Sequence, residues 1–371
     1  MSRFFFCYFE TTRRCNLDCP YCMTKRRNES FAGELSTDEA KHLVIDEVKK
    51  YSPKSAIAFS GGEFLLRPDA MELLAHNASL DQWSFINTNG EAIDETLLTD
   101  IREATNEKVT LVFSLDAVTK RDDVLTRDGA IEQLEEKTRL CQSKDVPYFY
   151  VVTISRSNMD DLRDILEFAT RDNRPVLRSP FVPRGGGDAH RSLMFDRCEM
   201  RDTIHPALRE SPLSYISYVP FVAAPKIYQR HWLKSKIAIK HLGCQAGRSY
   251  VGVSAEGDVA PCVHLLDGDA VCGNVRTTPL RDILEKSPLL TELRARKTLK
   301  GRCGRCRYVQ SCGGCRALAY YTHGDVLAED PTCFIDELTE AERKGIEDVQ
   351  NVNLATFADF ILSNPPWNEI F

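Results

Sequence analysis

The chain has 371 residues, of which 43% are hydrophobic and 27% are charged, and its net charge is −6. This length favours two domains over one small core, and the acidic balance gives no reason to expect nucleic acid or an anionic membrane surface as a partner. The apolar run FFFCYF near the N-terminus is too short for a signal sequence or a membrane span, so we expect a cytoplasmic protein.

Strand-like apolar runs alternate with helix-like amphipathic segments over residues 4–181. Strands are predicted at 4–9, 56–60, 83–87, 109–115, 148–154 and 176–181. Helices are predicted near 37–50, 69–79, 93–104, 129–143 and 159–170. This alternation predicts a parallel sheet with helical crossovers, and by itself it fits any doubly wound α/β fold.

A cysteine motif directly follows the first predicted strand. Cys15, Cys19 and Cys22 have the spacing C-x3-C-x2-C, and Tyr21 precedes the last of them. Three thiolates this close in sequence can converge on one soft metal centre, and they cannot all pair as disulfides. A cluster held by three cysteines keeps one iron open for a ligand that is not protein, much as a catalytic zinc keeps an open position. A zinc knuckle and three unrelated buried thiols are the alternatives.

The motif resembles the signature of radical S-adenosylmethionine (radical SAM) enzymes. The resemblance implies a 4Fe-4S cluster on these three cysteines, with S-adenosylmethionine chelated to the open iron. It also implies that an electron, from a flavodoxin- or ferredoxin-type donor, splits this cofactor to a 5′-deoxyadenosyl radical. The six strand–helix units then match the partial, TIM-like (β/α)6 barrel of the family, an α/β fold with functional residues at the carboxyl ends of its strands.

Candidate cofactor-binding residues lie at those strand ends. Two glycines after the second strand would let the backbone approach a ligand closely, and Glu63 can accept a hydrogen bond from an ammonium group. Ser114 and Asp116 point to the same side of the fourth strand and could face one ligand. By the resemblance, G-G-E contacts the methionine amino group and S-x-D reaches the ribose hydroxyls or the carboxylate. A turn or a helix cap is the ordinary alternative for such residues. The candidates are Tyr21, Ser60, Gly61, Gly62, Glu63, Asn87, Asn89, Ser114 and Asp116.

Residues 184–243 carry weaker signals. The run Arg184-Gly185-Gly186-Gly187 is expected to be a flexible loop after the sixth strand. The basic, partly amphipathic residues 226–241 are expected to bridge two domains and to wall the substrate space. Thr153, Ser155 and Arg178, in or after the fifth and sixth strands, are weaker candidates for the site.

A second cysteine pattern begins after residue 243. Tight C-x2-C pairs bring two thiolates to one metal, and seven such cysteines exceed what one tetrahedral site can use. They are Cys244, Cys262, Cys303, Cys306, Cys312, Cys315 and Cys333. A pair of zinc ribbons would tolerate the spacing of the last four of the array. The array resembles the SPASM extension of radical SAM enzymes, which implies two auxiliary iron–sulfur clusters.

The resemblance also assigns the ligands of these clusters. The outer cluster takes Cys303, Cys306, Cys312 and Cys333, and the inner cluster takes Cys244, Cys262 and Cys315. The fourth ligand of the inner cluster is Cys272 or His264, or this position is open to substrate or water. The spacer between Cys312 and Cys315 has two residues, where the family pattern often has three.

Together these patterns predict four segments. They are a radical SAM partial barrel at 1–187, a bridging helical segment at 188–243, a SPASM domain with two auxiliary clusters at 244–335 and a C-terminal helical tail at 336–371.

The resemblance implies an oxidoreductase that abstracts hydrogen from its substrate. Because auxiliary clusters can take an electron from a substrate radical, oxidation or cross-linking of a ribosomally made peptide or protein side chain is the first prediction. The alternative is oxidation, decarboxylation or dehydrogenation of a small metabolite, such as a tetrapyrrole, a sugar or a cyclitol. A non-catalytic iron–sulfur electron carrier is a remote third reading.

Two features bear on these readings. The barrel begins at Phe4, so a peptide substrate is expected to need a separate recognition protein or to lack a leader. No general base is identified, because Val263 stands where some relatives have an acidic residue.

Overall fold

One curved sheet organises the computed structural model, which describes residues 4–24, 33–118, 130–171, 173–211 and 243–350. The strand order is β6-β5-β4-β3-β2-β1-β7-β8-β9. The first half of the chain supplies β1 (Phe5–Thr12), β2 (Ser55–Gly61), β3 (Trp83–Thr88), β4 (Val109–Ser114), β5 (Tyr148–Ile154) and β6 (Val176–Pro180). These strands pair in parallel, and the sheet is not closed, because β6 and β9 are its edges.

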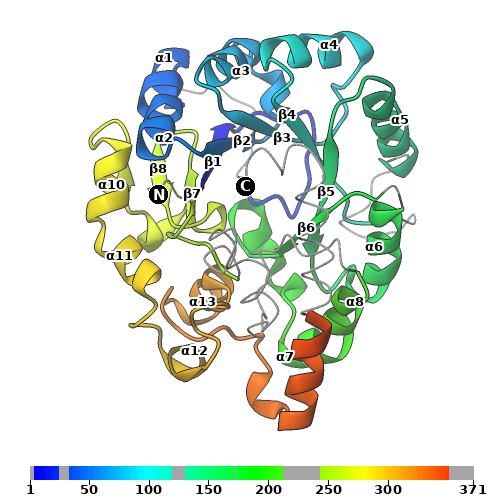
Figure 1. Cartoon of the computed structure of the whole chain (residues 1–371), viewed down its shortest axis with the longest axis vertical. Coiled ribbons are helices and arrows are strands. Elements are labelled where there is room, and N and C mark those ends of the chain that lie inside the picture. Colours follow the sequence, from blue (N-terminus) through cyan, green and yellow to red (C-terminus); the bar gives the residue numbers. More distant parts are fainter. Residues whose placement is uncertain (1–3, 25–32, 119–129, 172, 212–242, 351–371) are drawn as a thin grey trace.

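Helices connect these strands and cover the outer side of the sheet (Figure 1). They are α1 (Thr37–Glu39) and α2 (Asp46–Tyr51), which continue one another through residues 40–45, then α3 (Ala70–Ser79), α4 (Glu95–Ala104), α5 (Ala130–Ser143) and α6 (Leu162–Thr170). The predicted alternation of strands and helices is therefore confirmed. The first strand is longer than predicted, because it continues through polar residues up to Thr12.

Aromatic side chains close the end of the barrel at which the parallel strands begin. The ring of Phe6 lies 5.3 Å from that of Phe85 and 6.0 Å from that of Tyr250, and Phe85 lies 6.1 Å from Phe149. Each such pair contributes about 0.5–1.5 kcal/mol beyond the area that it buries. The packed floor leaves the carboxyl ends of the strands as the open end of the barrel.

The second half of the chain extends the same sheet beside β1. Its strand β7 (Tyr250–Val253) pairs in parallel with β1, and β8 (Asp258–Ala260) and β9 (Gly273–Asn274) follow as antiparallel strands. Its helices are α10 (Leu280–Lys286), α11 (Pro288–Ala295), α12 (Gly301–Arg305) and α13 (Arg316–His323). The cysteine-rich half is thus built onto the barrel through a shared backbone ladder.

The predicted bridge and tail are described in part. The bridge contains the short helices α7 (Arg197–Glu199) and α8 (His205–Arg209). The basic residues 226–241 lie outside the described residues, as does the tail beyond 350, while residues 340–350 are helical. No helix in the described part of the chain combines the length and apolar character that a bilayer crossing requires.

A buried ion pair ties β1 to the loop after β6. The Arg184 guanidinium donates to both carboxylate oxygens of Glu10, at 2.6 and 3.0 Å, and each side chain is only 1% exposed. Arg184 also donates to the Val263 carbonyl at 2.9 Å. The arginine of the predicted flexible loop is therefore fixed between the two halves of the chain.

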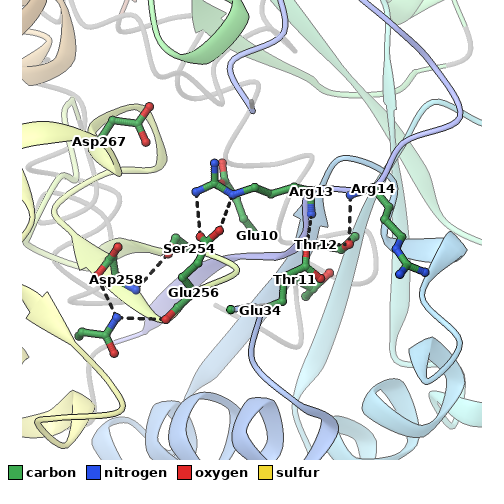
Figure 2. Close-up of polar contacts among 12 residues, drawn as sticks. Glu10, Thr11, Thr12, Arg13, Arg14, Glu34, Ser254, Glu256, Asp258 and Asp267 are labelled. Atoms are coloured by element: carbon green, nitrogen blue, oxygen red, sulfur yellow. Dashed lines mark hydrogen bonds and ion pairs between the residues drawn. The ribbon is translucent and has the colours of Figure 1, made fainter. Parts of the chain in front are cut away.

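Another ion pair joins the two halves of the chain, nearer the cysteine motif. Figure 2 shows the Arg13 guanidinium directed at Glu256, in the turn between β7 and β8, with Nε–Oε1 at 2.7 Å and Nη2–Oε2 at 2.8 Å. The Arg13 backbone N–H donates to Glu34 at 2.7 Å. The segment that leads into the cysteines is thus held on both sides.

We predict that Glu10→Gln destabilises the protein strongly. Loss of the carboxylate charge leaves the buried Arg184 with only the half-exposed Asp267 carboxylate, 3.4 Å from its Nε atom, which should lower the free energy of unfolding by about 3 kcal/mol. Glu210→Gln is the control, because Glu210 pairs with Arg163 at the surface, where both side chains are about 60% exposed. Urea unfolding at equal iron content measures both, and equal midpoints for the two variants would contradict the prediction.

Candidate functional site

A cavity of about 250 Å³ lies at the carboxyl ends of the parallel strands. The three cysteines of the first motif line it, together with every predicted cofactor-binding residue except Glu63. Its lining includes Cys15, Cys19, Tyr21, Cys22, Ser60, Gly61, Gly62, Asn87, Asn89, Ser114 and Asp116. Residues that lie far apart in the sequence therefore meet in one site.

Hydrogen bonds from neighbouring loops order the cysteine loop. The Cys15 thiol accepts from the Leu17 N–H at 3.4 Å, and the Asn89 side-chain amide lies 3.9 Å from the same sulfur. The Asn89 amide also donates to Asn16 at 2.8 Å, which ties the end of β3 to this loop. On the other side, the Cys22 carbonyl accepts from Gly186 N–H at 2.9 Å. Asn89 thus has a positioning role toward a cysteine in addition to lining the cavity.

The paired glycines after β2 allow two backbones to approach closely. Gly62 N–H donates to the Thr12 carbonyl at 2.8 Å, and Glu63 N–H donates to the Arg14 carbonyl at 2.6 Å. A Cβ atom on Gly62 would collide with the Arg14 carbonyl, and Gly61 has φ +127°, which other residues rarely adopt. Sequence reasoning assigned these glycines to ligand approach. The structure adds a second reason, because they hold the chain that carries the cysteines.

Glu63 lies behind the cavity wall and is fully buried. Its carboxylate accepts from the Asn89 N–H at 2.9 Å, the Thr88 hydroxyl at 3.1 Å and the Leu65 N–H at 3.3 Å. Burial raises the pKa of Glu63, and these donors act against that shift. In this geometry the carboxylate joins the ends of β2 and β3, so its acceptor positions point to the protein.

Asp116 connects the cysteine loop to β5. One carboxylate oxygen accepts from the Thr153 N–H at 2.7 Å, and the other accepts from the Tyr21 hydroxyl at 3.3 Å. Burial raises the pKa of Asp116 to about 6, although these hydrogen bonds favour the charged form. The cavity therefore contains a carboxylate that changes charge near neutral pH.

Several pocket residues were weak or absent in the sequence-based prediction. Thr153 lines the cavity, whereas Ser155 bonds to Asn158 and Arg178 lies close to His205, outside the cavity lining. Tyr8 was missed, although its hydroxyl lies 2.6 Å from Ser60 Oγ. The period-two alternation along β1 could have identified it, because the alternate residues of β1 face the barrel interior.

His264 reaches the cavity from the cysteine-rich half. It lines the cavity, and its Nε2 atom lies 3.0 Å from the Ser179 hydroxyl on β6. Burial, and then the charge of Arg184, lower its pKa to about 3, so the imidazole is neutral at physiological pH. Cys272, the other proposed completing ligand, donates from its thiol to the Ala270 carbonyl at 3.5 Å and lies near Ser287.

The C-terminal cysteines form two groups. One group lines a single small cavity of about 30 Å³ and consists of Cys303, Cys306, Cys312 and Cys333. The other group consists of Cys244, Cys262 and Cys315, whose thiols are close enough for their charges to interact. Within the described residues, no three His, Cys, Asp or Glu side chains converge closely enough to hold one metal ion.

We predict that Gly62→Ala displaces the cysteine loop, because the new Cβ cannot share space with the Arg14 carbonyl. After anaerobic reconstitution, iron should fall by about four atoms per chain, the content of one 4Fe-4S cluster. Gly345→Ala is the control, because no atom lies within 4 Å of its added Cβ. Full iron loading of both variants would contradict this account of Gly62.

Family models match both halves of the chain. The model of the radical SAM superfamily matches residues 9–169, and the SPASM model, an iron–sulfur cluster-binding domain, matches residues 244–316. These two ranges contain the cavity-lining cysteine motif and six of the seven cysteines of the second array. The resemblance inferred from the motifs is confirmed.

Curated relatives match over most of their length. An AdoMet-dependent heme synthase of Methanosarcina barkeri is 30% identical over 88% of this chain and 95% of its own. A pre-heme d1 synthase of Dinoroseobacter shibae is 29% identical over 93% and 89%. A PqqA peptide cyclase of Granulibacter bethesdensis is 26% identical over 87% and 85%.

A solved structure has the same fold. Native anSMEcpe with bound AdoMet and Cp18Cys peptide superposes with a TM-score of 0.66 at 17% identity, over 95% of this chain and 99% of that one. The predicted fold class is thereby confirmed as an open, mainly parallel α/β sheet. The chain belongs to the radical SAM superfamily and carries a SPASM iron–sulfur cluster-binding domain.

Proposed function

We propose that this radical SAM enzyme oxidises a carboxylate-bearing side chain of a tetrapyrrole, with decarboxylation as the outcome. The match to an AdoMet-dependent heme synthase over 95% of that protein carries this proposal, and the match to a pre-heme d1 synthase supports it. The proposal reverses the order of the sequence-based readings, in which a peptide substrate came first.

A peptide or protein substrate is the second candidate. The PqqA peptide cyclase relative favours it, with 26% identity over 85% of that protein. The solved structure with a bound peptide is only 17% identical to this chain. Its similarity therefore supports the fold and not the substrate.

The residues around the main cavity fit a cluster and S-adenosylmethionine. Cys15, Cys19 and Cys22 would hold a 4Fe-4S cluster, and the bound cofactor would supply a 5′-deoxyadenosyl radical that takes a hydrogen atom from the substrate. Ser114 and Asp116 project from the end of β4 to accept from its ribose hydroxyls, and Asp116 is oriented for this by the Thr153 N–H. The apolar side chains of Val151 and Leu177 line the same cavity and exclude water.

The wall formed by the cysteine-rich half faces the substrate in this proposal. Val263 and His264 line the cavity, and Ser179 fixes the imidazole by a 3.0 Å hydrogen bond. A neutral imidazole can donate or accept without adding charge next to a radical. For a carboxylate side chain to become an alkene, its radical must lose one electron and carbon dioxide.

Two auxiliary clusters would accept such electrons. The four cysteines around the small cavity fit the outer cluster, and Cys244, Cys262 and Cys315 fit the inner one. Cys272 is hydrogen-bonded to the Ala270 carbonyl and His264 faces the main cavity, so we assign the fourth inner position to a ligand that is not protein. We keep the division at 1–187, 188–243, 244–335 and 336–371, which accommodates the matched ranges 9–169 and 244–316.

The affinity of the protein for S-adenosylmethionine should fall as the pH is lowered. Because burial raises the pKa of Asp116 to about 6, its carboxylate is protonated as the pH drops through that value and can no longer accept from the ribose. The Kd should rise about tenfold between roughly pH 7 and pH 5. Titration of the reconstituted protein with the cofactor measures this change.

Asp116→Asn should bind the cofactor weakly at every pH in that window, since the amide does not titrate. Asp164→Asn, an exposed change on α6, should keep the pH dependence of the parent. A tenfold acid effect that persists in Asp116→Asn would show that another group is responsible.

The substrate class is tested with reduced, reconstituted protein and S-adenosylmethionine. An iron-containing porphyrin with carboxylate side chains should stimulate 5′-deoxyadenosine formation. Mass spectrometry should show that this porphyrin loses carboxyl groups. A metal-free porphyrin and a short cysteine-containing peptide are the comparison substrates. Modification of the peptide with no change in the porphyrin would overturn the proposal in favour of the second candidate.

A further inference from the structure

Two buried arginines lie between the two groups of C-terminal cysteines. Arg296 follows α11 and is 4% exposed, and Arg316 begins α13 and is 2% exposed. Arginine stays protonated in proteins, so two fixed positive charges are buried in this region.

Arg296 faces both groups of thiols. Its guanidinium donates to the carbonyls of Val309 at 2.8 Å and Gln310 at 2.9 Å, and also to the Cys244 carbonyl. Its charge interacts with the Cys244 thiol of the inner group and with the Cys312 and Cys303 thiols of the outer group. A single cation is therefore shared between the two groups.

Arg316 faces the outer group. Its Nη2 atom lies 3.5 Å from the Cys303 sulfur, and Nη1 donates to the carbonyls of Val326 at 3.0 Å and Ala328 at 2.6 Å. The same sulfur accepts from the Asp330 N–H at 3.3 Å. Cys303 therefore receives one charged and one neutral donor.

Among the described residues, the hydrogen-bond partners of the two guanidinium groups are backbone carbonyls and the Cys303 sulfur, and none is a carboxylate. The buried Asp330 carboxylate is nearby, but it accepts from the backbone N–H groups of Cys315 at 2.6 Å and Thr332 at 2.9 Å. Buried charges are normally paired, because an uncompensated charge is costly. An anionic partner is therefore expected, and thiolate-ligated clusters at both groups would supply it.

The spacer between Cys312 and Cys315 is shaped by these arginines. A Cβ atom on Gly313 would lie 2.5 Å from Arg296 Cζ, and one on Gly314 would lie 2.6 Å from Arg316 Nη2 and 2.7 Å from the Cys303 sulfur. Both glycines have positive φ, at +77° and +63°. The short C-G-G-C spacer thus leaves room for both guanidinium groups beside the two groups of cysteines.

We propose that Arg296 and Arg316 raise the reduction potentials of the auxiliary clusters, Arg296 acting on both clusters and Arg316 on the outer one. The proposal rests on the two clusters assigned under the proposed function. Reduction adds one negative charge to a cluster, and a fixed cation beside its sulfur ligands stabilises that form. In the proposed reaction such a cluster would take up the electron that the substrate radical loses on oxidation.

The test is an anaerobic redox titration of the full-length, reconstituted protein, monitored by electron paramagnetic resonance. The first cluster is recognised because S-adenosylmethionine perturbs its signal. Arg296→Gln should lower the potentials of both auxiliary clusters, and Arg316→Gln should lower one. Arg294→Gln is the matched control, because Arg294 lies in α11, two residues before Arg296, and donates to the Leu284 carbonyl. It should leave all potentials unchanged.

Conservative variants separate charge from structure. Arg296→Lys and Arg316→Lys keep the charge and should keep potentials close to those of the parent. Unchanged potentials in fully loaded glutamine variants would overturn the proposal. If the glutamine variants lose iron, the lysine variants decide, because lowered potentials with the charge in place would also overturn it. Parent protein that holds iron for only one auxiliary cluster would instead contradict the two-cluster assignment.

Discussion

The candidate site depends on a close contact between two backbones. The chain that leads from β1 into the first cysteines runs against Gly61-Gly62-Glu63, and the Thr12 and Arg14 carbonyls accept hydrogen bonds from that segment. Only residues without a Cβ atom permit this approach. The contact fixes the cysteine loop over the open end of the barrel. The cysteines line the cavity because of this contact.

The second half of the chain reinforces this arrangement from the other side. β7 pairs with β1, Arg184 donates to the Val263 carbonyl while it binds Glu10, and Arg13 binds Glu256 at the rim of the barrel (Figure 2). The first cysteine loop and the cysteine-rich half are therefore connected by backbone pairing of two strands, one ion pair and the hydrogen bond from Arg184. Such a connection explains why residues from both halves, such as Tyr8 and His264, line one cavity.

Local patterns predicted most of the barrel and much of the site. The six strands and their helices are found where apolar periodicity indicated, and the cofactor candidates other than Glu63 line the main cavity. That these residues bind a cofactor stays a prediction. Glu63 was expected to face a ligand, but its carboxylate is engaged by backbone donors from two strand ends. The partners of Arg184 and the reason for the C-G-G-C spacer could not be predicted, because they depend on contacts between residues far apart in sequence. Periodicity carries no information about such contacts.

The electrostatics of the two halves differ in a way that matches the proposed chemistry. The main cavity contains Asp116, whose charge changes near pH 6, and the neutral His264. The cysteine-rich half buries Arg296 and Arg316, which in our proposal favour electron acceptance by the auxiliary clusters. The most direct measurement is 5′-deoxyadenosine production by anaerobically reconstituted, reduced protein given S-adenosylmethionine. The account predicts production that is lost in Cys19→Ala, and intact cofactor with the fully loaded parent protein would contradict it.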